Sequence, residues 1–136
     1  MIKEKEIATL KVPFPNISSG LAVKSHMYIC KVSGKSKEML KCGSFKPKHA
    51  IKGFEPIHRV VKDAGDGNTF NVKTVIDCDR IFIFNDIKID KSIVKGHISN
   101  DVMKEIHIEL NNNSNLKKEL ISKVEMKSLN IKITDY

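Results

Sequence analysis

The stretch KTVIDCDRIFIF, residues 73–84, is the strand-like run that decides the fold class, and it places two carboxylates among apolar and β-branched residues. If the run forms one strand, Asp77 and Asp79 lie two positions apart and project from the same face of a sheet as Val75. The alternate residues then lie on the other face. Two neighbouring acids belong either to a solvated face that pairs with lysines or to a functional cleft. Both interpretations stay open at this level.

Shorter strand-like segments lie on either side of this run. Alternating apolar residues, apolar runs and flanking turn residues mark residues 7–14, 26–32, 38–46, 57–62 and 87–89. The second and third of these segments are joined by Ser-Gly-Lys, which is typical of a hairpin turn. We therefore expect five to seven short, mainly antiparallel strands.

The last third of the chain changes to a helical period. Residues 99–110 begin with the capping residue Ser99 and carry the apolar stripe Val102, Met103, Ile106 and Leu110, which predicts a helix. After an asparagine triplet, residues 115–126 resume helical spacing. A short tail with Ile131 and Ile133 pairs with the sheet or frays. Strands followed by helices predict an α+β fold, a small twisted sheet or barrel with C-terminal helices.

Composition predicts one soluble domain with an anionic partner. The chain has 136 residues, of which 40% are hydrophobic and 29% charged, which fits a single domain covering residues 1–136. A net charge of +8 favours nucleic acid or an acidic protein segment. No apolar run is long enough for a membrane span and the N-terminal residues lack the apolar segment of a signal peptide, so we expect a cytoplasmic protein.

No recognised motif for metal, nucleotide or serine-hydrolase chemistry is present. The three cysteines lie far apart with no C-x-x-C pair, which favours reduced, buried thiols over a zinc site. Phosphate-binding glycine motifs, zincin motifs and the nucleophile elbow are missing as well. We therefore expect no cofactor and no metal.

Polar residues at the ends of strands are the candidate site residues. His26 begins a strand directly after Lys24 and Ser25, and it is either a functional imidazole or a strand cap. Ser44 ends the next strand and is followed by further polar and cationic residues, a set that suits phosphate contacts or simply ends a basic hairpin. These followers are Lys46, Lys48 and His49. His58 favours a structural role, and His97 and His107 look incidental.

The order of several segments resembles the MazF/PemK family of toxin endoribonucleases. The segments are LKVPFPN, KSHMYIC, LKCGSF, TVIDCDRIFIFNDIKID and HISNDVMKEIHIEL, within residues 6–110. Residues 111–136 look like a helical extension. The resemblance implies an SH3-like barrel, usually a homodimer, that cuts single-stranded RNA such as mRNA without a metal, inhibits growth and is neutralised by an antitoxin. The same fold hosts gyrase inhibitors of the CcdB type, so the fold alone does not decide the function.

The resemblance carries over to particular residues of this chain. Ser44 matches the family's Ser or Thr at the end of the third strand, and Asp79 matches the acid that follows Cys in some members. The family's arginine is absent, because Ser25 stands there, so Lys24 or His26 would supply the cation or the acid. Asp77 replaces a residue that is basic in some members.

A metal-free reaction follows from these correspondences. The ribose 2′-hydroxyl is the nucleophile, with Asp79 or His26 as its base, His26 or Lys24 as the acid, and Ser44 and Lys46 on the phosphate. The expected catalytic residues are Lys24, His26, Ser44 and Asp79. The expected RNA contacts are Ser25, Lys46, Lys48, His49, His58 and Asp77.

Two other functions remain open. The missing arginine favours a barrel that binds RNA without cutting it, and the fold also permits a gyrase-directed toxin. In the toxin hypothesis, an acidic and apolar antitoxin segment lies across the same groove as the RNA and competes with it.

Overall fold

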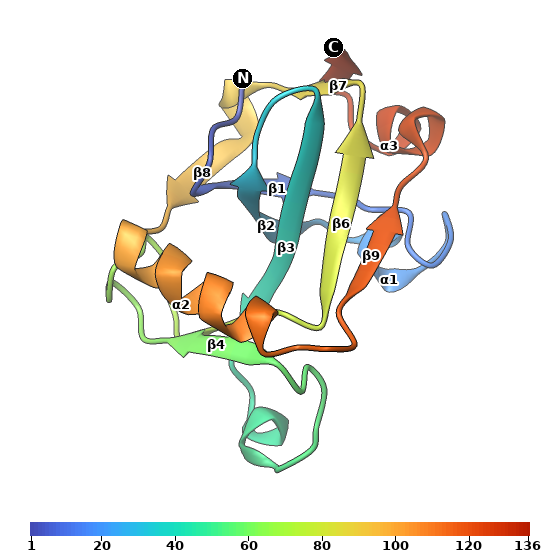
Figure 1. Ribbon diagram of the computed structural model, residues 1–136. Coiled ribbons are helices and arrows are strands. Elements are labelled where there is room, and N and C mark those ends of the chain that lie inside the picture. The colour runs from blue at the N-terminus through green and yellow to red at the C-terminus, as the bar shows by residue number, and fades with distance from the viewer.

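The fold is α+β, with an eight-stranded, mostly antiparallel sheet and a separate two-stranded sheet (Figure 1). The computed structural model describes residues 1–136. The strands are β1 (Glu6–Leu10), β2 (His26–Val32), β3 (Ser36–Ser44), β4 (Arg59–Lys62), β5 (Thr74–Asp77), β6 (Arg80–Asn85), β7 (Ile87–Ile89), β8 (Val94–His97), β9 (Lys117–Leu120) and β10 (Ile133–Asp135). The helices are α1 (Gly20–Val23), α2 (Asn100–Asn111) and α3 (Lys123–Leu129), with 3₁₀ turns at Pro47–Ala50 and Lys91–Ile93.

The long strand β3 organises the main sheet. One edge of β3 pairs with β2, and its other edge pairs with β6 near its beginning and with β5 near its end. The path then runs β4-β5-β3-β2-β1-β8, and hydrogen bonding does not close it into a barrel. β9 adds in parallel to the outer edge of β6, and β7 pairs with β10. Ten strands therefore form, more than the five to seven expected.

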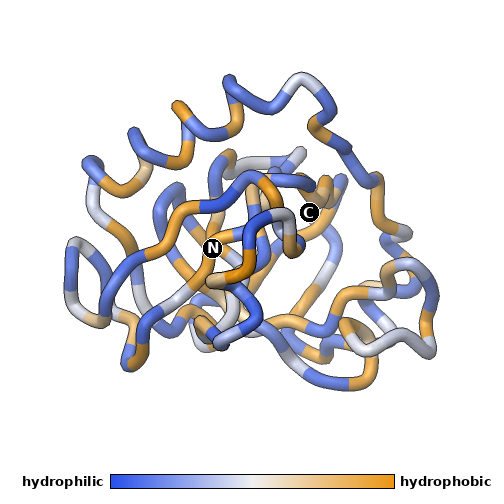
Figure 2. The backbone as a smooth tube through the Cα atoms, turned by 90° about the horizontal axis from the view of Figure 1, so that it is seen from below, coloured by the Kyte–Doolittle hydropathy of each residue, from blue (hydrophilic) through white to orange (hydrophobic).

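The main sheet is buried on both faces. Alternate residues of the central strands enter two separate hydrophobic clusters, with Ala8, Tyr28 and Met39 in one cluster and Ile7 and Leu40 in the other. The first cluster is completed by Met126 of α3 and by β7 and β10, and the second by the apolar stripe of α2. This arrangement explains why successive residues in β2 and β3 are apolar, as in sheets covered on both sides. Figure 2 shows hydrophobic and hydrophilic stretches alternating along the chain.

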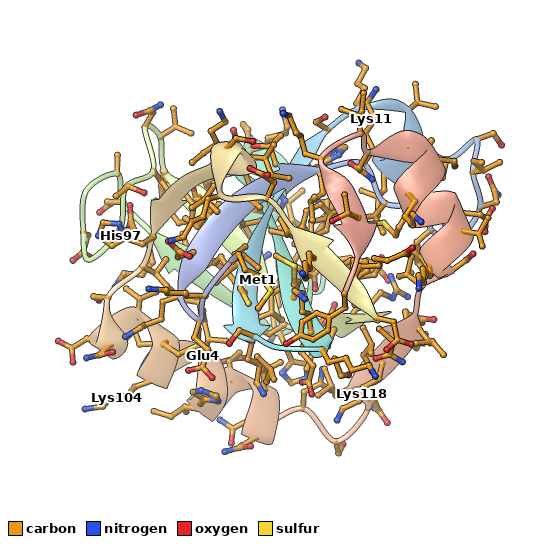
Figure 3. The ribbon with its side chains drawn as sticks, turned by 90° about the horizontal axis from the view of Figure 1, so that it is seen from above. Met1, Glu4, Lys11, His97, Lys104 and Lys118 are labelled. Atoms are coloured by element: carbon orange, nitrogen blue, oxygen red, sulfur yellow. The ribbon has the colours of Figure 1, made fainter.

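The helix expected at residues 99–110 is confirmed as α2. The Ser99 hydroxyl accepts a hydrogen bond from the Val102 amide at 3.2 Å, which caps the first turn. The stripe Val102, Met103, Ile106 and Leu110 is buried as predicted. Along the rest of the helix the polar residues face outward, and Lys104 points away from the sheet (Figure 3).

The helix expected over residues 115–126 is wrong for its first half. Lys117–Leu120 forms β9 because the free edge of β6 offers unpaired backbone groups, and this pairing outweighs the helical spacing of a short polar segment. A new helix, α3, begins after Ser122, whose hydroxyl accepts from the Glu125 amide at 3.3 Å. The tail with Ile133 pairs with β7, and Ile121 and Ile133 are buried in the core.

The run at residues 74–84 is two strands and not one. Ile76 pairs with Cys42 and Phe82 pairs with Met39. The segment from Ile76 to Phe82 is therefore twice as long, in residue-to-residue steps, as the part of β3 that it faces. The surplus residues form an excursion at residues 77–79, from the end of β5 to the start of β6, with Cys78 buried at its centre. The two carboxylates therefore do not alternate along one strand, and Asp79 lies in the connection.

The buried hydroxyl of Tyr28 allows a test of the energetics of the core. Its side chain is fully buried against Phe82, with ring centroids 5.8 Å apart, yet its hydroxyl has no hydrogen-bond partner. A buried hydroxyl without a partner costs about 1 kcal/mol or more. We expect Tyr28→Phe to raise the free energy of unfolding by about 1 kcal/mol in urea denaturation.

Tyr136→Phe is the matched control, because the Tyr136 side chain is 49% exposed and its hydroxyl forms no hydrogen bond within the chain. We expect the control to change stability by less than about 0.5 kcal/mol. A Tyr28→Phe variant less stable than the parent protein would contradict the proposed hydroxyl cost.

Candidate functional site

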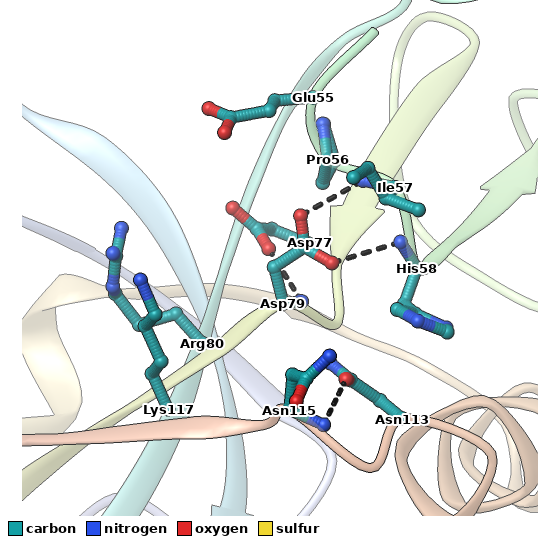
Figure 4. A pocket seen from close by; sticks show the side chains of 10 residues that line it. All are labelled: Glu55, Pro56, Ile57, His58, Asp77, Asp79, Arg80, Asn113, Asn115 and Lys117. Carbon is teal, nitrogen blue, oxygen red and sulfur yellow. Dashed lines mark hydrogen bonds between the residues drawn. The ribbon is translucent and has the colours of Figure 1, made fainter. Parts of the chain in front are cut away.

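Two adjoining cavities lie where β3 and β5 end. The first, the histidine cavity, has a volume of about 240 Å³ and the second, the aspartate cavity, about 310 Å³. The histidine cavity is lined by His26, Lys41, Gly43, Ser44, Lys46, Lys48, His49, Pro56, Val75 and Asp77. The aspartate cavity is lined by Glu55, Pro56, Ile57, His58, Asp77, Asp79, Arg80, Asn113, Asn115 and Lys117 (Figure 4). Asp77 and Pro56 line both, so the cavities are neighbours.

His26 in the histidine cavity is held in a defined tautomer. Its Nδ1 lies 2.9 Å from the carbonyl oxygen of Lys24. Because a carbonyl only accepts hydrogen bonds, Nδ1 carries the proton. The neutral ring therefore has a lone pair on Nε2, the form that a general base requires.

His49 is held in the opposite tautomer. Its Nδ1 accepts a hydrogen bond from the backbone amide of Lys46 at 2.8 Å, so the neutral ring carries its proton on Nε2. Desolvation lowers the pKa of His49, and the positive charges of Lys48, Arg59 and Lys41 lower it further. A neutral His49 can donate a hydrogen bond from Nε2, and the cavity thus combines one imidazole acceptor with one imidazole donor.

The lysines of the histidine cavity have no acidic partner. No carboxylate lies within ion-pair distance of Lys41, Lys46 or Lys48, although the chain forms ion pairs elsewhere. The Ser44 hydroxyl at the end of β3 is exposed and has no hydrogen-bond partner in the chain. Unpaired ammonium groups beside a free hydroxyl are suited to binding a phosphate.

Asp79 holds the loop between the two cavities. Its two carboxylate oxygens accept hydrogen bonds from the backbone amides of Ile57 and His58, both at 2.8 Å (Figure 4). Such charge-assisted hydrogen bonds are stronger than neutral ones. Asp79 therefore fixes the strand entry at residues 57–58 against the excursion at 77–79, and each of its oxygens accepts one hydrogen bond.

The rest of the excursion is also hydrogen-bonded. Asp77 Oδ1 accepts from the Asp79 amide at 2.8 Å, and the Cys78 amide donates to the carbonyl of His58 at 2.9 Å. The buried Asn113 donates to the Cys78 carbonyl at 3.0 Å, and the Lys117 amide donates to the Asp79 carbonyl at 3.2 Å. Every backbone polar group of residues 78–79 is thus satisfied, as buried backbone requires.

Asp77 keeps one carboxylate oxygen without a hydrogen-bond partner in the chain. Burial raises the pKa of Asp77, and the charge of Asp79 adds to the rise, while the Asp79 amide, Lys41 and Arg80 oppose it. The ionised carboxylate is therefore less stable here than in water, and a donor entering the cavity would stabilise it.

Cations face the two acids across the aspartate cavity. Arg80 and Lys117 lie on the side opposite Ile57 and His58 (Figure 4). The Arg80 guanidinium lies 4.6 Å from the centre of the Phe14 ring, and its Nε lies 3.4 Å from Glu119. No carboxylate lies within ion-pair distance of Lys117.

The structure brings together many of the residues expected from the sequence. The histidine cavity gathers His26, Ser44, Lys46, Lys48, His49 and Asp77. The aspartate cavity contains His58 and Asp79, and His58 Nδ1 lies 3.2 Å from Glu109. Lys24 and Ser25 are exposed and line neither cavity, so Lys24 acts on the site through its carbonyl.

Sequence reasoning missed several lining residues. Lys41 precedes a buried cysteine on β3 and is recognisable as the polar position of an alternating strand. Arg80 was hidden by the expectation of an unbroken strand. Asn113, Asn115 and Lys117 fall in a segment expected to be a break and then a helix, so no pattern connected them with Asp77.

Neither a family model, nor a curated protein, nor a solved structure matched the chain. No group of three or more His, Cys, Asp or Glu side chains is arranged to hold a metal ion. None of the helices has the length and apolar character needed to cross a bilayer.

The anchoring role of Asp79 predicts a stability effect. Replacing it with alanine leaves the amides of Ile57 and His58 without their acceptor, so we expect Asp79→Ala to lower the free energy of unfolding by about 2 kcal/mol. Asp79→Asn keeps one acceptor oxygen, so its free energy of unfolding should lie between those of the parent protein and Asp79→Ala. Chemical denaturation measures both effects.

Asp63→Ala is the control, since Asp63 is exposed and its side chain forms no hydrogen bond or ion pair. Equal stabilities for Asp79→Ala and Asp63→Ala would show that the Asp79 contacts do not hold the loop.

Proposed function

We propose that this protein is a metal-independent endoribonuclease that cuts single-stranded RNA, a toxin of the MazF/PemK type. The observation that carries the proposal is the histidine cavity. There His26 offers a lone pair, His49 offers an N–H, and Ser44 stands among lysines that lack acidic partners. These are the groups needed to cleave a phosphodiester whose ribose supplies its own nucleophile.

The reaction assigned to this site is an internal transesterification. His26 Nε2 takes the proton of the 2′-hydroxyl, the 2′-oxygen attacks phosphorus, and the bond to the 5′-oxygen breaks. Ser44, Lys46 and the Nε2–H of His49 stabilise the charge that grows on the phosphate oxygens. The 5′-oxygen takes its proton from an ammonium group or from water. The products are a 2′,3′-cyclic phosphate and a free 5′-hydroxyl.

The proposed base is His26 and not Asp79. Both carboxylate oxygens of Asp79 accept backbone amides, so a proton transfer to Asp79 would weaken those charge-assisted hydrogen bonds. The Nε2 of His26 has no hydrogen-bond partner within the chain.

An aromatic and basic loop beside the histidine cavity supports single-stranded RNA as the substrate. The segment 45–58 protrudes from the body beyond β4 (Figure 1). His49 lies 5.6 Å from Phe45 and 6.4 Å from Phe54, measured between ring centres. Lys73 lies over Phe45 and Lys48 over Phe54. Unpaired bases stack on such rings while lysines hold their phosphates.

The proposed fold family is the SH3-like barrel. Strands β4 and β8 are the two ends of the hydrogen-bonded path, but the segment after β4 reaches the segment after β8. Asn68 forms a bridge with Ile98, and the Thr69 amide donates to the His97 carbonyl at 3.2 Å. This contact supports a barrel that is nearly, though not fully, closed by hydrogen bonds.

The proposal extends to partners and place of action. The protein would act as a cytoplasmic homodimer, and its antitoxin would present an acidic and apolar segment to the lysines of the histidine cavity. Because that segment and RNA need the same cations, the two would exclude each other.

A barrel that binds RNA without cutting it is the second candidate. The observation that favours it is the absence of the family arginine, since Ser25 stands at that position and lines neither cavity. Both candidates predict RNA binding that weakens steeply with salt, and only the first predicts cleavage.

Cleavage of a long single-stranded RNA in EDTA tests the proposal. We expect discrete fragments with cyclic phosphate ends, and a loss of about a hundredfold or more in rate for His26→Ala, because the general base is removed. Lys24→Ala should keep most of the rate, since its backbone carbonyl remains.

His107→Ala is the matched control, because this exposed histidine lies on α2 and lines neither cavity. Intact RNA at high protein concentration, together with salt-dependent binding, would decide for the non-catalytic candidate. Neither binding nor cleavage would reject both.

A further inference from the structure

The aspartate cavity adjoins the proposed reaction centre but holds none of its reacting groups. It shares Asp77 and Pro56 with the histidine cavity, so a nucleotide bound beside the scissile phosphate can reach it. Its volume of about 310 Å³ is at the small end of ligand sites. Ile57 is its only hydrophobic lining residue, which suits a polar group read by hydrogen bonds.

The hydrogen-bonding groups left free in this cavity form a distinct pattern. On the acceptor side, one oxygen of Asp77 and the whole carboxylate of Glu55 have no hydrogen-bond or ion-pair partner in the chain. On the donor side, the terminal nitrogens of Arg80 and the ammonium of Lys117 have none either. Acids and cations lie on different walls (Figure 4).

From this pattern we infer that the aspartate cavity is a base-reading pocket that selects guanine in single-stranded RNA. The inference rests on the proposed function, because it assigns a substrate preference to the same RNA site. Guanine presents two neighbouring donors, N1–H and N2–H, which suit the free oxygen of Asp77 and the Glu55 carboxylate. Its O6 and N7 are neighbouring acceptors that suit an arginine or lysine.

The other bases fit this arrangement less well. Adenine and cytosine each place a ring nitrogen acceptor beside their amino group, and that acceptor would face the Asp77 carboxylate. Uracil offers one donor between two carbonyl oxygens. Only guanine matches the acid wall with two donors and the cation wall with two acceptors.

Arg80, Asp77 and Asn113 are held in place before any base enters the pocket. Arg80 is oriented by the Phe14 ring and by Glu119. Asp77 is oriented by its contact to the Asp79 amide, and Asn113 ties the Cys78 carbonyl to the chain segment that carries Lys117. Such preorganisation reduces the cost of binding and sharpens discrimination.

The test uses labelled oligouridylates that carry one central guanosine, inosine, adenosine or cytidine. Inosine lacks only the N2 amino group of guanine. We expect the guanosine oligonucleotide to be bound, and cut next to the guanosine, about tenfold or more better than the inosine one. This comparison needs only the parent protein, so it holds even if a variant fails to fold.

Two variants locate the preference. Asp77→Asn keeps an oxygen for the Asp79 amide but turns the free acceptor into a donor, so the ratio of guanosine to inosine should fall toward one. Lys117→Ala should lower the ratio of guanosine to adenosine. Lys118→Ala is its control, because the neighbouring Lys118 points away from the body of the protein and lines neither cavity (Figure 3).

The outcomes separate the two proposals. Equal binding and cleavage of the guanosine and inosine oligonucleotides, or preference for another base, overturns the guanine pocket. The ribonuclease proposal is then unaffected. Guanosine preference in binding without any cleavage supports the pocket and rejects catalysis. Failure to bind or cut any of the oligonucleotides overturns both.

Discussion

The carboxylate of Asp79 is the contact on which the arrangement of both cavities depends. It accepts the amides of Ile57 and His58 and so joins the end of the protruding loop to the excursion between β5 and β6. That junction acts together with the hydrogen bond from the Cys78 amide to the His58 carbonyl and with the pairing of Arg59 and Asp77. Asp77 and Asp79 thus have different roles. Asp79 holds the chain, and Asp77 presents a free carboxylate oxygen.

Because the main sheet is buried on both faces, it tolerates the irregular segment at residues 77–79. The alternate residues of β2 and β3 pack into separate clusters, so the strands beside the excursion are fixed from above and below. Polar residues are then concentrated at the strand ends, where β3 finishes at Ser44 and β5 at Asp77. Lys41, Lys46 and Lys48 gather at this end of the sheet without ion-pair partners.

The sequence predicted the regular elements well and the irregular ones poorly. Alternation identified β1 and the β2–β3 hairpin, and a capped apolar stripe identified α2, because these signals are local. The excursion at residues 77–79 is invisible in the pattern, since its cause is the pairing of Ile76 and Phe82 with distant residues. Ser44, Lys46 and His49 were found together because they are neighbours in the chain, whereas Lys117 meets Asp77 only through the parallel pairing of β9.

That parallel pairing has a consequence for the order in which the molecule is completed. During synthesis the first strands leave the ribosome and can pair before β9 has been made. The outer edge of β6 stays unpaired until Lys117–Leu120 has been made. The wall of the aspartate cavity formed by Asn113, Asn115 and Lys117 is completed at the same stage. A nascent chain can therefore assemble the histidine cavity early, but the aspartate cavity is complete only after β9 has been made.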